Sequence, residues 1–226
     1  MRLLLVGYGR MGRLVETLAA EQGDTVVARI DEDGGDWAVP ADVAIDFSTA
    51  EALEGNFARY VERALPVVIG TTGWTHLAGA LREQADRAGL GVVASANFSI
   101  GVNLFLVLAA QAASLMQARP EYGAWVHELH HAAKRDAPSG TAILIRDEMR
   151  EAGYTHPIDV SSTRAGRIPG THTIGFDGLS DTIELTHTAR DRQGFASGAL
   201  LAAHWLPGRR GWYSMADVLA VRASGR

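Results

Sequence analysis

The chain has 226 residues, 47% of them hydrophobic, and a formal net charge of −5. This length suggests one large or two small domains, and the apolar content argues against disorder. The negative charge argues against a general nucleic-acid surface, so we expect no nucleic-acid partner. The absence of cysteine excludes disulfides, thiolate metal ligands and cysteine nucleophiles.

The sequence shows no targeting or membrane segment. No apolar run approaches the ~20 residues of a membrane span, so we expect no membrane partner. The apolar run at residues 3–6 is too short for a signal peptide and no cleavage site follows it, which favours a cytoplasmic location. One count is unusual: of the 21 basic residues, 20 are arginine, and only Lys134 is lysine.

The first segment of the chain carries a glycine motif between a strand pattern and a helix pattern. The apolar run 3–6 predicts a buried strand, residues 13–20 have helical spacing, and 25–30 is a second β-branched run that ends at Asp31. Between the first strand and the helix, residues 7–12 are Gly-Tyr-Gly-Arg-Met-Gly, the G-x-G-x-x-G pattern of dinucleotide-binding proteins.

Each residue type in this motif has a physical reason. Gly7 allows a tight turn, Gly9 lets the backbone approach a pyrophosphate, and Gly12 lets the helix pack on the strand. The helix N-terminus offers free N–H groups to the phosphates, and Asp31 would accept hydrogen bonds from the ribose hydroxyls. A glycine turn without a ligand is the alternative, but strand, helix and acidic residue together favour dinucleotide binding.

Strand and helix patterns alternate through the rest of the first half. A capping box, Ser48-x-x-Glu51, predicts the start of one helix. The alternation predicts a doubly wound parallel sheet, whose ligands bind at the carboxyl ends of the strands. Residues 70–72 and 95–98 follow two such ends and could line a nicotinamide site, although ordinary loop chemistry explains them equally well. The strands are predicted at 43–47, 66–69 and 91–94, and the helices at 49–64 and 75–88.

The pattern changes in the second half, where several strand patterns follow one another. The long apolar segment 102–118 predicts a buried helix, and another helix is predicted at 195–205. Consecutive strands predict a sheet of mixed or antiparallel type, and hence a second, α+β domain. These strands are predicted at 124–131, 159–165, 171–176 and 181–189.

The densest group of chemically active side chains lies in the segment 128–141. His130 and His131 can exchange protons near neutral pH, and Lys134 can supply a charge or a proton. A helix is predicted at 142–149, so the residues just before it would offer N–H groups and hydroxyls to an anion such as a carboxylate. These residues are Ser139, Gly140 and Thr141.

The same segment also matches the H-E-x-x-H pattern of zinc peptidases, with His127 and His131 as ligands and Glu151 as a third. That site requires a helix, whereas residues 122–126 favour a strand, on which the two histidines would stand roughly 13 Å apart. We therefore expect no metal site and keep a zinc hydrolase as the less favoured alternative.

Over almost its whole length the sequence resembles the 4-hydroxy-tetrahydrodipicolinate reductase (dihydrodipicolinate reductase) family of the diaminopimelate route to lysine. Residues 128–142, Glu-x-His-His-x-x-Lys-x-Asp-Ala-Pro-Ser-Gly-Thr-Ala, are close to a family fingerprint. The glycine motif matches as well, and so do the segments 70–73, 96–103, 164–172 and 187–198.

The resemblance implies an NAD(P)H-dependent oxidoreductase that acts on a cyclic dicarboxylate. It implies a Rossmann-type domain at 1–98 with a C-terminal return at 207–226, and a substrate domain at 99–206 whose sheet builds a homotetramer. His130 would be the catalytic proton donor and acceptor, and Lys134 a proton donor. The implied substrate-binding residues are His131, Ser139, Gly140 and Thr141. The implied cofactor-binding residues are Gly7, Tyr8, Gly9, Arg10, Met11, Gly12, Asp31, Gly70, Thr71, Thr72, Ser95, Ala96, Asn97 and Phe98.

Two features of the first domain bear on the cofactor. The glycine loop is one residue shorter than the G-x-x-G-x-x-G form that is commoner in the family. Asp31 is followed by Glu32 and Asp33, with no arginine to pair with a 2′-phosphate, which favours NADH. Arg10 could still reach a phosphate, so use of NADPH stays open.

Two further alternatives remain: a related reductase of another small oxo or imino acid, and a non-catalytic dinucleotide-binding module. The single lysine of the chain stands at the implied proton-donor position. A guanidinium is broad, planar and holds its proton, whereas an ammonium is compact and can release one. We therefore expect this position to reject arginine.

Overall fold

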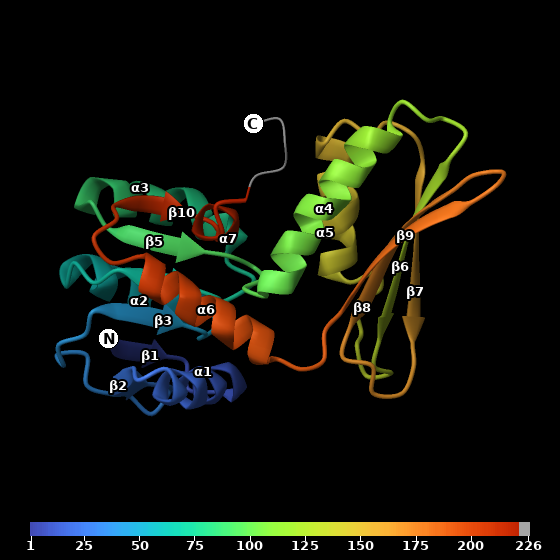
Figure 1. Cartoon of the computed structure of the whole chain (residues 1–226). Helices are drawn as coiled ribbons and strands as arrows, with labels where there is room; N and C mark the ends of the chain where they lie inside the picture. Colours follow the sequence, from blue (N-terminus) through green and yellow to red (C-terminus); the bar gives the residue numbers. More distant parts are fainter. Residues whose placement is uncertain (222–226) are drawn as a thin grey trace. The chain divides into compact units, whose positions relative to one another are not determined.

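The computed structural model describes residues 1–221, which divide into two compact units (Figure 1). The first unit contains Met1–Ile100 and Arg192–Ala220, and the second contains Gly101–Asp191 and Val221. Residues 222–226, the end of the predicted C-terminal return, lie outside the described part of the chain. Among the described residues, no helix combines the length and the apolar character that a membrane crossing requires.

The first unit is built on a six-stranded parallel sheet. Its strands are β1 (Arg2–Val6), β2 (Thr25–Ile30), β3 (Val43–Asp46), β4 (Val67–Ile69), β5 (Gly91–Ala94) and β10 (Gly211–Tyr213). They lie in the order β10-β5-β4-β3-β1-β2, and every neighbouring pair is parallel. Leu3, Leu4 and Leu5 of β1 are almost completely buried, as expected for a strand covered on both faces. The predicted doubly wound sheet is confirmed.

Two hydrophobic clusters hold helices against this sheet. The helices are α1 (Arg10–Glu21), α2 (Ala50–Glu62), α3 (Ala78–Ala88), α6 (Gln193–Trp205) and α7 (Met215–Val218), with a short 3₁₀ turn η1 (Thr75–Leu77). In one cluster, Val15 and Ala19 of α1 pack with the apolar side of α6. In the other, Leu53 and Phe57 of α2 pack with Leu81 of α3. The apolar residues of these helices are therefore spaced so that they lie on the face that packs against the sheet.

Helix α6 corrects the predicted domain boundary. Residues 99–206 were predicted to form the second domain and the return was predicted to begin at 207, but the chain re-enters the first unit at Arg192. Ala199 and Leu200 of α6 are fully buried in the cluster that also contains α1 and the central strands. An apolar helix pattern shows that a helix is buried, but it does not show which of two sheets the helix covers.

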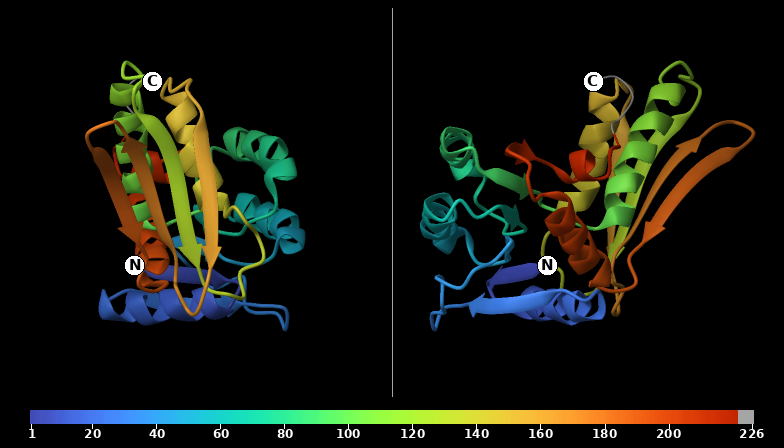
Figure 2. Two further views of the ribbon diagram at one scale, coloured as in Figure 1. Left: turned by 90° about the vertical axis from the view of Figure 1, so that its right-hand side faces the viewer. Right: turned by 60° about the vertical axis from the view of Figure 1, so that its left-hand side comes forward.

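The second unit is a four-stranded mixed sheet covered by two helices. Its elements are α4 (Ile100–Met116), β6 (Gly123–His130), α5 (Gly140–Glu151), β7 (Ile158–Arg164), β8 (Thr171–Asp177) and β9 (Thr182–Thr188). The strand order is β7-β6-β8-β9, with β6 parallel to β7 and antiparallel to β8. Both helices lie on the same face of the sheet (Figure 2). The predicted α+β character of this part is confirmed.

Burial alternates along β6, which decides where its side chains lie. Ala124, Val126, Glu128 and His130 are buried, whereas the residues between them are only partly buried. Successive side chains of a strand point to opposite faces, so Glu128 and His130 share the face that carries the helices.

Candidate functional site

The glycine motif joins β1 to α1. We call residues Gly7–Gly12 the glycine cradle, because its three glycines carry no side chain. Gly7 has a φ of +83°, and a Cβ there would collide with the backbone of Phe47 and Ser48. A Cβ at Gly12 would collide with the carbonyl oxygen of Gly7, so α1 can approach β1 only with glycine at this position. A Cβ at Gly9, in contrast, would meet nothing within 4 Å. The open side of the cradle is therefore at Gly9.

The start of α1 fits a phosphate group. Gly9 is the N-cap residue and brings no capping side chain, and the first turn contains no acidic residue. The N–H groups of this turn and the positive end of the helix dipole are therefore free to bind an anion. Arg10 is exposed and Met11 is partly buried in the same turn, and the arginine adds a positive charge. These residues fit the pyrophosphate of a dinucleotide.

The end of β2 carries Asp31, which is exposed. Its backbone forms a closed turn with Gly34, with hydrogen bonds of 3.0 and 2.9 Å in the two directions. Arg29, on the same strand, is ion-paired with Glu16, and Glu16 also accepts a hydrogen bond from the Tyr8 hydroxyl. The Arg29 guanidinium lies 5.4 Å from the centre of the Tyr8 ring. Arg29 is thus held against α1 and the glycine loop.

The buried carboxylate of Asp46 ties together the loops that follow β3 and β4. It is 0% exposed and accepts hydrogen bonds from Ser48 Oγ at 2.6 Å, Tyr60 OH at 2.7 Å and Thr71 Oγ1 at 3.0 Å. Because Ser48 is committed to Asp46, the N-cap of α2 is Thr49 and not the predicted Ser48. No role was predicted for Asp46 from the sequence, although an acidic residue at the end of an otherwise apolar strand indicates one.

A hollow of about 380 Å³ opens beside the ends of β4 and β5 in the first unit. Four residues predicted near the nicotinamide line it, namely Thr71, Thr72, Ser95 and Ala96. The indole groups of Trp74 and Trp212 form part of its other walls. Apolar walls with a few hydroxyl groups are typical of a site for a small organic ring.

The other three residues predicted in these loops shape the loops themselves. A Cβ at Gly70 would collide with the ring of Phe47. Phe98 is 2% exposed, and its ring centre lies 6.2 Å from that of Phe47. Asn97 Oδ1 accepts a hydrogen bond from the Ser99 N–H at 2.9 Å. Gly70 and Phe98 shape these loops through packing and Asn97 through its hydrogen bond, and their predicted contact with the cofactor stays a prediction.

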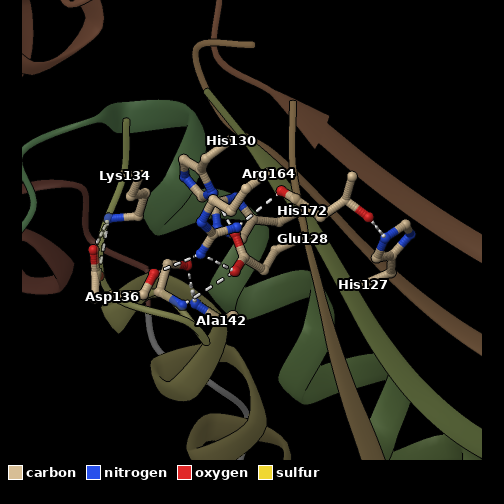
Figure 3. A network of polar contacts seen from close by, with 10 residues as sticks. His127, Glu128, His130, Lys134, Asp136, Ala142, Arg164 and His172 are labelled. Atoms are coloured by element: carbon tan, nitrogen blue, oxygen red, sulfur yellow. Dashed lines mark hydrogen bonds and ion pairs between the residues drawn. The ribbon is translucent and has the colours of Figure 1, made fainter. Parts of the chain in front are cut away.

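Glu128 and His130 of β6 begin the second group of predicted site residues (Figure 3). Glu128 is fully buried, and its Oε1 accepts hydrogen bonds from Arg164 Nη2 at 2.6 Å and from the Ser139 N–H at 3.2 Å. Its Oε2 contacts His130 Nδ1. Burial raises the pKa of Glu128, but hydrogen bonds from Arg164, Ser162 and His130 outweigh burial and lower the pKa to about 2. Glu128 is therefore a carboxylate at neutral pH.

His172 of β8 lies beside His130 in the same buried region. The two imidazole centres are 5.1 Å apart in an edge-to-face arrangement, and His172 Nε2 lies 3.3 Å from Ser139 Oγ. Burial and the neighbouring His130 lower the pKa of His172 to about 4, so His172 is neutral at pH 7. Burial also lowers the pKa of His130, against the raising effect of Glu128. No chemical role was predicted for His172 from the sequence.

The loop that follows β6 places Lys134. Its Nζ lies 2.7 Å from Asp136 Oδ1, and its side chain is 24% exposed. Its backbone N–H donates to the carbonyl oxygen of the half-buried His131 at 3.0 Å, which closes the turn. The ammonium is close enough to His130 to disfavour the charged form of that imidazole and so lower its pKa. The structure thus brings together His130 and Lys134, as predicted.

The start of α5 separates the predicted anion-binding residues into two groups. Ser139 is the N-cap residue and is 2% exposed, and its hydroxyl accepts a hydrogen bond from the Ala142 N–H at 3.2 Å. Ser139 is therefore held in the protein interior by its hydrogen bonds, and its predicted contact with substrate stays a prediction. Gly140 is exposed and Thr141 is half-buried, and the first turn of α5 contains no acidic residue. These two residues are the accessible part of this helix end.

The geometry required for the zinc peptidase alternative is absent. The segment around His127 is a strand, so His127 and Glu128 lie on opposite faces of the sheet. A different trio, Glu128, His130 and His172, has its potential ligand atoms within 4.8 Å of one another. The guanidinium of Arg164 already lies 2.6 Å from the carboxylate of this trio, so a metal cation bound there would be repelled by a positive charge.

Comparison with known proteins gives a consistent result over nearly the whole chain. The family model "Dihydrodipicolinate reductase, N-terminus" matches residues 1–98, and "Dihydrodipicolinate reductase, C-terminus" matches residues 101–219. The 4-hydroxy-tetrahydrodipicolinate reductase of Archaeoglobus fulgidus is 38% identical and covers 97% of this chain and 100% of the relative. That of Christiangramia forsetii is 36% identical and covers 97% of this chain and 98% of the relative.

A solved structure has the same fold. The dipicolinate-bound dihydrodipicolinate reductase from Paenisporosarcina sp. TG-14 has a TM-score of 0.79 and covers 96% of this chain and 98% of its own. Its sequence identity is 23%, so this likeness concerns the fold alone. The family models and the relatives confirm the resemblance that the sequence motifs predicted. The chain therefore belongs to the dihydrodipicolinate reductase family of oxidoreductases.

Proposed function

We propose that this chain reduces 4-hydroxy-tetrahydrodipicolinate to tetrahydrodipicolinate with a reduced nicotinamide nucleotide, in the diaminopimelate route to lysine. The observation that carries the proposal is the site of the second unit, which holds His130, Lys134 and the exposed start of α5 (Figure 3). Proton donors beside an anion-binding helix end suit a cyclic dicarboxylate. The names of the curated relatives support this substrate. We expect such a biosynthetic reduction in the cytoplasm.

The chemistry of the reaction explains why the site needs an acid. The hydroxyl group of the substrate leaves as water, and a hydride, which the nucleotide supplies when bound, arrives at the same ring carbon. Negative charge then develops on the conjugated system, and an acid must supply a proton. His130 can donate this proton from Nε2, because its Nδ1 faces Glu128. Lys134 supplies positive charge beside it and is the second candidate donor.

The carboxylates of the substrate require positive and hydrogen-bonding groups. The N–H groups of Gly140 and Thr141 lie in the first turn of α5, where the helix dipole favours an anion. His131 and Lys134, from the preceding loop, offer side-chain donors. Ser139 fixes the start of α5 from the protein interior, because its own N–H donates to Glu128.

The glycine cradle of the first unit would hold the nucleotide, with its pyrophosphate at Gly9 and the start of α1. We propose a preference for NADH. Asp31 suits free ribose hydroxyls and repels a 2′-phosphate. Arg29, the cation on the same strand, is ion-paired with Glu16 and therefore already neutralised. The structures of other dehydrogenases with this type of fold include one in complex with NAD⁺, which supports a nicotinamide nucleotide.

A homotetramer built on the sheet of the second unit is also part of the proposal. Trp125 and Leu129 of β6 lie on the face opposite α4 and α5, and within the second unit no described helix covers that face. Threonine pairs cross this sheet at 3.2 Å (Thr171 with Thr188) and 3.0 Å (Thr173 with Thr186). Light scattering after size-exclusion chromatography would test this, because a monomeric mass contradicts it.

A coupled assay tests the proposed function. The upstream synthase generates the unstable substrate in the cuvette, and the nicotinamide absorbance reports turnover. We expect a loss of NADH absorbance that depends on both the synthase and this protein, with a slower rate for NADPH. Folded protein that binds NADH but gives no substrate-dependent loss would contradict the reductase and favour a non-catalytic dinucleotide-binding module.

A further inference from the structure

We propose that Glu128, paired with Arg164, is a positioning residue that holds the His130 proton on Nδ1 and so presents Nε2 for proton exchange with the substrate. The inference rests on the proposed function only where it makes His130 the proton donor. The arrangement of the side chains that it describes is independent of the substrate (Figure 3).

The contact between Glu128 and His130 follows from the strand. The two residues are two positions apart on β6, so both side chains lie on one face, and Glu128 Oε2 contacts His130 Nδ1. Glu128 is fully buried and ionised, so it can only accept hydrogen bonds. His130 must therefore donate from Nδ1, which leaves the lone pair of the neutral ring on Nε2.

Arg164 keeps this carboxylate charged and connects it to the loop that carries Lys134. In the parallel pairing of β6 with β7, Arg164 stands opposite His130. Its Nη2 donates to Glu128 Oε1 at 2.6 Å and to the carbonyl oxygen of Asp136 at 2.6 Å. The side chain of Asp136 in turn holds Lys134 Nζ at 2.7 Å. The Arg164 guanidinium thus connects Glu128, which contacts His130, to Asp136, which holds Lys134.

The Nε2 side of His130 is kept clear by a glycine. A Cβ at Gly170 would lie 3.0 Å from Nε2 and 3.3 Å from Cδ2, tighter than ordinary van der Waals contact. The edge-to-face neighbour, His172, is neutral at pH 7 and brings no second positive charge. The ring is therefore fixed on its Nδ1 side, and no side chain at position 170 crowds Nε2.

The proton step that results is balanced. In the charged imidazolium, the Nε2–H bond breaks and the proton goes to the substrate, while the electron pair of that bond stays on Nε2. The neutral ring keeps its Nδ1–H donated to Glu128, and water returns a proton to Nε2 before the next turnover. The carboxylate stabilises the imidazolium throughout and does not itself take the proton.

The first test reads the tautomer of His130 directly in the wild-type protein by ¹⁵N NMR, with the signal assigned by its loss in His130→Gln. We expect a protonated Nδ1 and an unprotonated Nε2 in the neutral ring. A neutral ring protonated on Nε2 would overturn the proposal, whatever the activity of the enzyme. Because this readout needs no substrate, failure of the positioning role and failure of the proposed function are distinguishable.

The second test compares Glu128→Gln with a matched control, Glu83→Gln. The first removes the charge but keeps the shape and an oxygen for the Ser139 N–H; the second removes an exposed Glu–Arg pair in the first unit. For Glu128→Gln we expect kcat to fall about 10²-fold, and the His130 limb of the pH profile to move down by about one pH unit or more. We expect no change for Glu83→Gln.

Three results complete this second test. Partial recovery of the wild-type pH profile in Glu128→Asp, which restores the charge, would support the proposal. A Glu128→Gln enzyme with a lower kcat but an unshifted pH profile would reduce Glu128 to a structural role and overturn it. If Glu128→Gln does not fold, the wild-type tautomer decides.

Discussion

The two units of this chain build their sites in opposite ways. The glycine cradle of the first unit consists of backbone groups at positions that carry no side chain. Gly7 and Gly12 permit close approach of the neighbouring backbone, and Gly9 faces open space. The site of the second unit consists of charged side chains from distant segments, such as Glu128 and Arg164, which are 36 residues apart.

This difference predicts how each site fails. A backbone cradle loses function when volume is added to it, because a ligand occupies the space that a side chain would fill. A network of charges loses function when a charge is moved or removed, even where volume is kept. Substitutions in one unit should therefore leave the other site intact.

The largest expected effect is that of Lys134→Arg, which keeps the positive charge but changes the shape and the acidity of the group. We expect kcat to fall about 10²- to 10⁴-fold, because a broad, planar guanidinium cannot take the place of the compact ammonium beside His130 or serve as the second proton donor. NADH affinity should be unchanged, since the glycine cradle lies in the other unit. Steady-state kinetics and calorimetric titration with NADH measure both quantities, and a near-normal kcat would refute the role of Lys134.

His172→Gln tests the charge network through stability. The pKa of His172 is about 4 in the folded protein against 6.5 for an ordinary histidine, so the folded state favours the neutral ring. The contribution of His172 to the free energy of unfolding is fully present above pH 6.5. It is lost as the pH falls toward 4, because the ring then becomes protonated. This loss is on the order of 3 kcal/mol, and His172→Gln should remove it from the pH dependence. Urea unfolding across this range measures it; equal slopes for wild type and variant would contradict the assignment.

Gly9→Ala tests the cradle by adding one methyl group where the protein leaves open space. The backbone at Gly9 has a φ of −79°, which alanine adopts without strain, so the apo protein should fold with a cost of no more than about 1 kcal/mol. NADH affinity should fall about tenfold or more, equivalent to roughly 1.4 kcal/mol. Calorimetric titration checks this, and unchanged affinity would place the pyrophosphate elsewhere.

Gly55→Ala supplies the smallest expected effect and the matched control for the cradle. Gly55 lies in the middle of α2, it is exposed, and a Cβ there would also meet nothing within 4 Å. Alanine should stabilise the protein by about 0.5–1 kcal/mol through helix propensity. NADH affinity and kcat should match the wild type. A loss of affinity equal to that of Gly9→Ala would show that the cradle is not a distinct site.

The same contrast explains how much could be predicted from sequence. The cradle is encoded in one contiguous segment whose spacing fixes a strand, a turn and a helix, so the motif alone predicted that Gly7–Gly12 connect a strand to a helix. The strand β6 was likewise predicted from its sequence, and a strand excludes the zinc geometry for His127.

Contacts between distant segments could not be predicted in this way. The role of Arg164 depends on the register of β7 against β6, and that of His172 on the pairing of β8 with β6. Strand β10 has only three residues, and its parallel pairing with β5 carries no local signal. Ser139 was predicted at a helix start, but sequence spacing does not show that its N–H donates to Glu128 or that its hydroxyl accepts from Ala142.

The most direct test of the proposed reaction is the fate of the hydride. NADH that carries deuterium at the transferable position of the nicotinamide is supplied with the synthase-generated substrate, and the product is analysed by mass spectrometry. The account predicts a single deuterium in tetrahydrodipicolinate, on the ring carbon that lost the hydroxyl group. Product without deuterium, or substrate consumed without oxidation of NADH, would contradict it.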